Sequence, residues 1–455
     1  MRRRSAPSRF ARAISALWAS ILAAAPVGAA CPQQITYLSD APGDPYRYLE
    51  DQQRQVYDEN PGLADPYSLA ELKTPRAVAN FAELKRRALE ACPKGKPRSS
   101  CALDPDLVDK LFGSIECITL PTRFESPLFA SLIALDSEAV DKVRLTRYPK
   151  SPATRFGSLP TGSFDAQAIH PPGSTLPLVI LNRDIFFFTG ALSKALSDAI
   201  PIAEGPMVAL DYSEDGIRKR LRATPYIVHN FADAMSRLVR EGSSNGAMEI
   251  TLDETHNHLH ARLVTAMDLF LLAHEQAHIV LGHVSDKSVA FRLAGGRASA
   301  HSVPAVRRGA RTRTVPAGAS RQPATSLQAA LRTREQEYEA DALGLKLLMW
   351  SRHEDGDPIA EMVAGAAPHM MFRVLDAANA YGAEAGGWTF GDANHPSAAD
   401  RIAALAPVFD GLAAESDVLR QVDFRIMFDA AFKVLLEEAD PEIRRNLGLA
   451  PRAKK

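Results

Sequence analysis

The segment that most constrains the fold of this chain runs from Leu271 to His283 and contains the pattern H-E-x-x-H. His274 and His278 are four residues apart, so on an α-helix their side chains project from one face about one turn apart. This spacing lets two imidazole nitrogens bind one tetrahedral zinc ion. Glu275 lies beside the first histidine and could take a proton from an attacking water. The segment therefore predicts a helix that carries a metal site.

A second, acidic pattern lies within residues 327–352, which the sequence predicts as a helix. A zinc hydrolase with two histidine ligands needs a third protein ligand and leaves the fourth position to water. Glu337 fits this role, and Asp341, one turn later, could accept the outward N–H of a ligating histidine. Glu335 and Glu339 form a competing pair at the same spacing. We prefer Glu337 because it alone is followed by an aspartate four residues later; the alternative is a solvated acidic face.

A third segment is Asn394–Arg401, with the sequence N-H-P-S-A-A-D-R. Pro396 suits the first turn of a helix, which would place His395 at the positive end of that helix and Arg401 further along it. Either side chain could stabilise the oxyanion that forms when water adds to a peptide carbonyl. The alternative for His395 is a structural role before the helix.

Taken in this order, the three segments resemble the zinc metallopeptidases of the CaaX prenyl protease family over roughly residues 247–405. The shared motifs are H-E-x-x-H followed by G-H, then E-x-E-A-D, then H-P-x-x-x-x-R. The family includes membrane heat-shock proteases and soluble periplasmic chaperone-proteases. The resemblance implies a gluzincin site with one zinc ion per chain on three ligands, His274, His278 and Glu337. It also implies Glu275 as the general base, with His395 and Arg401 near the transition state.

Several features of that family have no counterpart in this sequence. No segment matches the strand along which the family binds its substrate, and residues 178–187 and 248–252 are the two candidates for it. No multispan membrane section is present, and no helical repeat array follows the catalytic part. The resemblance therefore implies the chemistry but not the choice of substrate.

The N-terminus is typical of an export signal. Five arginines, the last of them Arg12, precede an apolar run from Ala13 to Val27, and the small residues Gly28–Ala30 follow. This run is too short for a convincing membrane span, although a retained anchor is the alternative. We therefore predict that residues 1–30 are a signal peptide and that the mature protein is periplasmic.

The cysteines support an oxidising compartment, because all four lie before residue 120 and none lies near the metal motif. In an exported chain, an even set confined to one region predicts two disulfides whose pairing stays open. Cys31 follows the predicted cleavage point, so a lipidated cysteine is the alternative at that position. The four are Cys31, Cys92, Cys101 and Cys117.

The charge of the chain argues against a nucleic-acid partner. Removal of residues 1–30 leaves 48 basic and 54 acidic residues, a formal charge of −6 for the mature chain. By contrast, residues 291–334 hold nine arginines and no acidic residue. We predict that residues 291–325 are a disordered insertion. It is either a solvated loop or a mobile flap attracted to the acidic body or to anionic lipid, which would give peripheral contact with the membrane or envelope.

These patterns predict an α+β fold, mainly helical, with a small sheet beside the active-site helix and a disulfide-tied helical region at the N-terminus. The predicted strands lie within residues 176–188 and 247–252. The predicted helices cover residues 76–91, 104–112, 189–200, 225–241, 253–283, 327–352, 358–381, 396–405 and 424–439. The predicted organisation is a signal peptide (1–30), a cysteine-containing region (31–122), the first part of a gluzincin-like metallopeptidase domain (123–290), the arginine-rich insertion (291–325), and the second part of the domain with C-terminal helices (326–455).

The function that these patterns predict is an exported zinc endopeptidase that acts on protein or peptide substrates in envelope protein processing or quality control. One alternative is a zinc-stabilised binding or chaperone-like envelope protein with little or no turnover. Another is an effector or defence peptidase with a single dedicated target. Cleavage of an unfolded protein that a chelator blocks would separate the first alternative from the enzyme.

Overall fold

The computed structural model describes nine stretches of the chain and a few isolated positions at residues 68–86 and 244. The stretches are residues 36–59, 119–160, 166–203, 209–242, 254–284, 324–354, 356–386, 396–421 and 423–452. The predicted signal peptide, all four cysteines, His395, residues 248–252 and almost all of the arginine-rich insertion lie outside them. The predictions for those segments therefore stay predictions.

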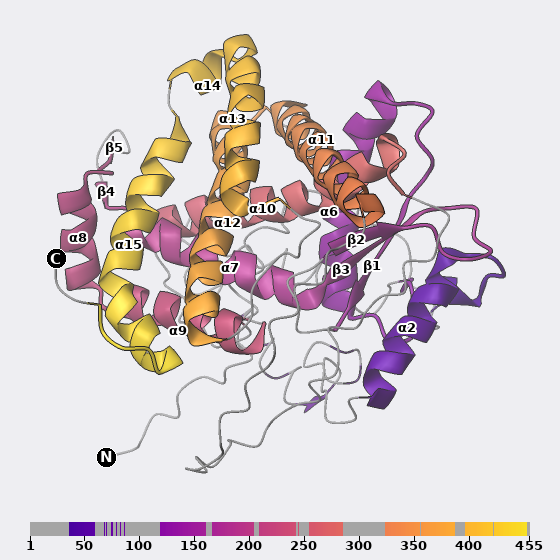
Figure 1. Cartoon of the computed structure of the whole chain (residues 1–455), viewed down its shortest axis with the longest axis horizontal. Helices are drawn as coiled ribbons and strands as arrows, with labels where there is room; N and C mark the ends of the chain where they lie inside the picture. The colour runs from indigo at the N-terminus through magenta and orange to yellow at the C-terminus, as the bar shows by residue number, and fades with distance from the viewer. Residues whose placement is uncertain are drawn as a thin grey trace.

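Helices dominate the described residues, and a small sheet lies to one side of them (Figure 1). The sheet and α2 occupy the right of the view, and helices α8, α9 and α15 occupy the left. The helices are α2 (Pro45–Glu59), α6 (Pro127–Arg147), α7 (Arg183–Ala199), α8 (Glu214–Ala223), α9 (Tyr226–Glu241), α10 (Glu254–Val280), α11 (Ala324–Glu354), α12 (Pro358–Ala385), α13 (Ala398–Glu415), α14 (Asp417–Gln421) and α15 (Phe424–Leu447), with a short 3₁₀ helix η1 (Leu38–Asp40). The strands are β1 (Arg155–Leu159), β2 (Ala166–Ile169), β3 (Leu178–Asn182), β4 (Ile202–Ala203) and β5 (Ala209–Leu210). The predicted α+β class is confirmed.

Local capping explains several helix boundaries, including two where the prediction was wrong. α7 begins at Arg183, six residues before the predicted start, because the Asn182 side chain accepts a hydrogen bond from the backbone N–H of Asp184. α13 begins at Ala398, because the Ser397 hydroxyl accepts one from Asp400. Pro396 therefore precedes the helix cap and is not in the first turn.

The three-stranded sheet has the order β1-β3-β2, with β1 parallel and β2 antiparallel to β3. Every residue of β3 is buried, as expected for a short apolar strand with partners on both sides. The candidate substrate strand at residues 178–187 was therefore wrong. Residues 178–182 form the central strand β3, both edges of which are already paired. Residues 183–187 belong to the start of α7. Among the described strands of this sheet, β1 and β2 form the edges.

A buried charge pair links the sheet to the segment before it. The Arg183 guanidinium lies 3.4 Å from the Glu125 carboxylate and donates to the Phe124 carbonyl at 2.7 Å and to the Ser158 hydroxyl at 2.8 Å. The Gln53 side-chain amide donates to the Ser158 carbonyl at 2.7 Å. Because buried charges persist only when they are paired and hydrogen-bonded, this network fixes α2, β1 and the start of α7 relative to one another.

α10 is the central helix of the fold. It packs against α6, α7, α11 and α12 and also contacts β2 and β3. Apolar side chains buried along it include Leu263, Met267 and Phe270, at spacings of three and four residues that place them on one face. Among the described helices, none has the length and apolar composition needed to cross a membrane. Because these elements surround α10, they hold its position from several sides.

Candidate metal centre

α10 presents both histidines of the H-E-x-x-H pattern toward α11. His274 is 7% exposed, and the Nε2 atoms of His274 and His278 lie 3.2 Å apart. The two rings are nearly perpendicular, with an interplanar angle of 86°. The spacing of four residues along a well-packed helix produces this convergence, because both side chains leave the same face one turn apart. Two lone pairs at this distance repel unless a proton or a metal ion lies between them.

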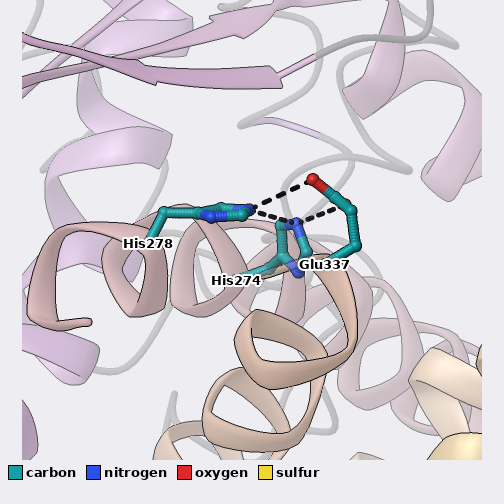
Figure 2. Close-up of side chains that lie close together, drawn as sticks. All are labelled: His274, His278 and Glu337. Carbon is teal, nitrogen blue, oxygen red and sulfur yellow. Dashed lines mark hydrogen bonds and ion pairs between the residues drawn. The ribbon is translucent and has the colours of Figure 1, made fainter. Parts of the chain in front are cut away.

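The third member of the cluster is Glu337 on α11, 59 positions after His278 in the sequence. Its Oε2 lies 3.5 Å from Nε2 of His274, and its Oε1 lies 3.5 Å from Nε2 of His278. Figure 2 shows the carboxylate of Glu337 pointing from the neighbouring helix toward the ring nitrogens of His274 and His278. Within the described residues, these three form a group with the ligand types and spacing of a metal site. Glu335 and Glu339, the competing pair, are not part of the group.

The dimensions of the cluster fit a tetrahedral ion. Three N or O donors at roughly 2.0–2.2 Å from one ion, in tetrahedral directions, lie about 3.3–3.6 Å from one another. The two Nε2 atoms, 3.2 Å apart, are close to one such edge, and each nitrogen lies 3.5 Å from a different oxygen of Glu337. With one donor atom taken from each residue, all three lie within 4.8 Å of one another. Two imidazoles and one carboxylate are also a donor set that zinc accepts, with one position left for water or substrate.

A glycine brings the two helices close enough to form the cluster. A Cβ built on Gly344 of α11 would lie 3.0 Å from both Cα and N of His274, tighter than ordinary van der Waals contact. The contact is with backbone, which cannot rotate away as a flexible side chain would. Asp341 lies about one turn before Gly344, and Glu337 about two turns before it. The close crossing of α10 and α11 therefore holds both carboxylates near His274.

We expect Gly344→Ala to destabilise the fold by about 1–3 kcal/mol, the typical cost of overpacking, and to weaken metal binding. Alanine alone would favour the helix by about 1 kcal/mol, so a net loss would show that the steric contact dominates. Gly411→Ala on α13 is the matched control, because a Cβ there meets nothing within 4 Å and should stabilise. Urea unfolding of both metal-free variants measures the difference. Equal effects for the two would contradict this account.

Asp341 lies behind His274 and is itself held by Arg401. Oδ1 of Asp341 is 3.0 Å from Nδ1 of His274, the nitrogen that faces away from the cluster. The Arg401 guanidinium binds both oxygens of this carboxylate, with distances of 2.7 Å from Nε and 2.5 Å from Nη2. It also lies 4.3 Å over the ring of Phe372 on α12. The three side chains therefore fix the orientation of the first imidazole through a bidentate ion pair and an aromatic stack.

The charged groups around the cluster favour a positive charge there. Burial alone would lower the pKa of His274, but the neighbouring carboxylates of Asp341 and Glu337 raise that pKa to about 10. Burial alone would likewise raise the pKa of Glu337, yet the two imidazoles hold it well below its usual range. The pKa of Asp341 is lowered against the effect of its burial, mainly by Arg401. Both carboxylates are therefore ionised, and that of Glu337 brings a negative charge to the point where the two Nε2 atoms meet.

The predicted catalytic residues are in different situations. Glu275 is 6% exposed, and its charge acts on the Arg401 guanidinium, so the two lie within electrostatic reach. Arg401 is 3.8 Å from Glu337 but forms its short bonds with Asp341. Its expected role at the oxyanion stays a prediction, and the structure gives it a firm role in holding Asp341. His395 lies outside the described residues.

One contact at the site was missed by the sequence analysis. His283, the histidine of the G-H motif, has two polar contacts. Its Nδ1 lies 3.1 Å from Nδ1 of His278, and its Nε2 lies 3.1 Å from Oε2 of Glu339. Burial and the neighbouring His278 lower the pKa of His283. The available signal was the glycine at position 282, because a left-handed glycine after a helix turns the chain back.

The two helices α10 and α11 thus present two histidines and a glutamate to one point, a group that could hold a metal ion. The chain matches the model of Peptidase family M48 over residues 259–408, about one third of its length. This span contains the H-E-x-x-H segment, Glu337, Asp341 and Arg401, and it confirms the family resemblance noted from the motifs. The match places this part of the chain among the metallopeptidases, which are hydrolases. No curated protein and no solved structure matches the chain.

Proposed function

We propose that the protein is an exported zinc-dependent endopeptidase of envelope protein processing or quality control. The observation that carries the chemistry is the convergence of His274, His278 and Glu337, with separations of 3.2–3.5 Å between α10 and α11. The family match supports peptide-bond hydrolysis as the reaction. Zinc is the proposed ion because its preferred ligand types and tetrahedral geometry agree with this cluster.

In this proposal each residue has a defined task. When bound, zinc supplies a Lewis acid that polarises the scissile carbonyl and activates water. Glu275 accepts a proton from the attacking water and delivers it to the nitrogen of the leaving amine. Water is thereby added across one C–N bond, with no net change in protonation of the enzyme. His395 or Arg401 offsets the negative charge that develops on the carbonyl oxygen of the substrate.

Hydrolysis of an unfolded protein tests the reaction class. We expect the purified protein to cleave denatured casein, a chelator to stop the cleavage, and one equivalent of zinc per chain to restore it. Peptides released from internal positions would mark an endopeptidase. A protein that binds zinc stoichiometrically but cleaves neither casein nor unfolded peptides would instead be the binding or chaperone-like alternative.

The proposed export is supported by the basic and apolar N-terminal pattern in residues 1–30 and by the confinement of the cysteines to residues 31–117. N-terminal sequencing of the protein from a periplasmic extract tests it. A mature chain that begins near Cys31 is expected, and a chain found only in the cytoplasm with its first residues intact would contradict the proposal.

A further inference from the structure

We propose that His283 and Glu339 are positioning residues that hold the second metal-ligating imidazole, His278. This inference rests on the proposed function, since it assigns a task at the same metal centre. In this arrangement, each of the two histidine ligands is oriented by a different carboxylate. His274 has Asp341 directly behind it, whereas His278 reaches Glu339 through His283.

The backbone places His283 beside His278. α10 was predicted to continue to His283, but it ends at Val280 because Gly282 adopts a left-handed conformation with φ of 71°. The N–H of His283 then donates to the carbonyl of His278 at 2.9 Å, and the N–H of Gly282 donates to that of Ile279 at 3.2 Å. These two bonds are those of a Schellman motif, in which the second residue after the C-cap (here Leu281) folds back over the last turn of the helix. The position of His283 is therefore fixed by the chain and not by the side-chain contact alone.

The distances determine where the protons lie when His278 binds a metal through Nε2. A ligating nitrogen offers its lone pair, so the ring proton of neutral His278 is on Nδ1. Nδ1 of His283, 3.1 Å away, must then accept that proton's hydrogen bond, which leaves the proton of His283 on Nε2. That N–H donates to Oε2 of Glu339 at 3.1 Å. Each donor thus meets an acceptor along the whole chain of contacts.

The same geometry excludes His283 as a ligand of this ion. Its ring contacts Nδ1 of His278, on the opposite side of the ring from the Nε2 that meets His274 and Glu337. The His283 side chain is only 10% exposed, whereas Glu339 is 63% exposed. Glu339 can therefore be shortened without leaving a cavity, which makes it a cleaner site for mutation than the buried histidine.

The test is the zinc affinity of purified full-length variants, measured by competition with a chromophoric chelator. We expect His283→Ala to weaken zinc binding by about 10–100-fold, the usual effect of removing a group that orients a metal ligand. His283→Asn should recover most of the loss, because its Oδ1 can take the place of Nδ1 as the acceptor. Glu339→Ala should weaken binding by a smaller factor, about 3–10-fold, because the His278–His283 contact survives.

Glu335→Ala is the matched control. Glu335 is an exposed carboxylate on the same helix, four residues before Glu339, so its loss removes the same charge. Its variant should bind zinc as the wild type does. In parallel, visible absorption of the cobalt-substituted proteins should change for His283→Ala and return toward wild type for His283→Asn, which a role in folding alone would not produce.

Two results would overturn the inference. One is a His283→Ala protein whose zinc affinity stays within twofold of wild type. The other is an equal loss for Glu335→Ala and Glu339→Ala, which would reduce the effect to general charge. If His283→Ala does not fold, His283→Asn and Glu339→Ala still decide between these outcomes. Failure of the proposed function is distinct, because it would appear in the wild type as absence of zinc binding or of cleavage.

Discussion

Glu275→Gln is expected to reduce peptidase activity by about 10²–10⁴-fold while zinc stays bound at one ion per chain. Glutamine has nearly the same shape as glutamate, so it fits a side chain that is 6% exposed. It cannot accept a proton from water at neutral pH, however, and the proposed base is lost. The cluster of His274, His278 and Glu337 does not include this residue, so metal content should not change.

The measurement is the steady-state rate of cleavage of a quenched peptide, beside elemental analysis of the same preparation. The free energy of unfolding of the zinc-loaded variant should match that of wild type, which serves as the control for folding. Undiminished turnover in a zinc-loaded Glu275→Gln protein would remove Glu275 from the proposed role and require another base.

Glu337→Ala is expected to lose the metal, with zinc affinity lowered by more than about 10²-fold. Removal of this carboxylate leaves two imidazole ligands, one fewer than the three that such sites use. It also removes a negative charge 3.8 Å from the guanidinium of Arg401 and 3.5 Å from both imidazoles. The positive charge of Arg401 would then be less well neutralised, which disfavours the binding of a metal cation nearby.

Elemental analysis after dialysis against a weak chelator measures this loss. Glu335→Ala again controls for charge removed from α11, and it should retain one zinc ion per chain. Full zinc occupancy in Glu337→Ala would contradict the assignment of the third ligand. Loss of zinc in both variants would point to a general effect of charge.

Local parts of the fold follow from the sequence. The helix at residues 225–241 agrees with α9 within one residue, because its apolar residues recur on one face and Gly242 ends it with a φ of 73°. Asp357 accepts hydrogen bonds from the N–H groups of residues 359 and 360, which starts α12 at the predicted Pro358. Such boundaries depend on residues within one turn of each other.

The predictions were wrong where a helix end depended on a capping residue, or where a strand's position in the sheet depended on residues far away in the sequence. The apolar stretch after residue 177 reads equally well as an edge or a central strand, since periodicity does not say which neighbours pair with it. Only the sheet shows β1 and β2 on either side of it. α10 ends at Val280 and not at the predicted His283, because Gly282 adopts a left-handed conformation with φ of 71°.

The sequence by itself determined that His274 and His278 lie on one helix at the spacing of two metal ligands, because helix geometry places side chains four residues apart on one face. It did not determine which acidic residue completes the cluster, since Glu335, Glu337 and Glu339 all lie on α11. That was decided by the crossing of α10 and α11 at Gly344, which turns one face of α11 toward His274. The contact of His283 with Glu339, 56 positions apart, depends on the same crossing. The bond of Arg401 to Asp341, 60 positions apart, depends instead on the packing of α13 against α11.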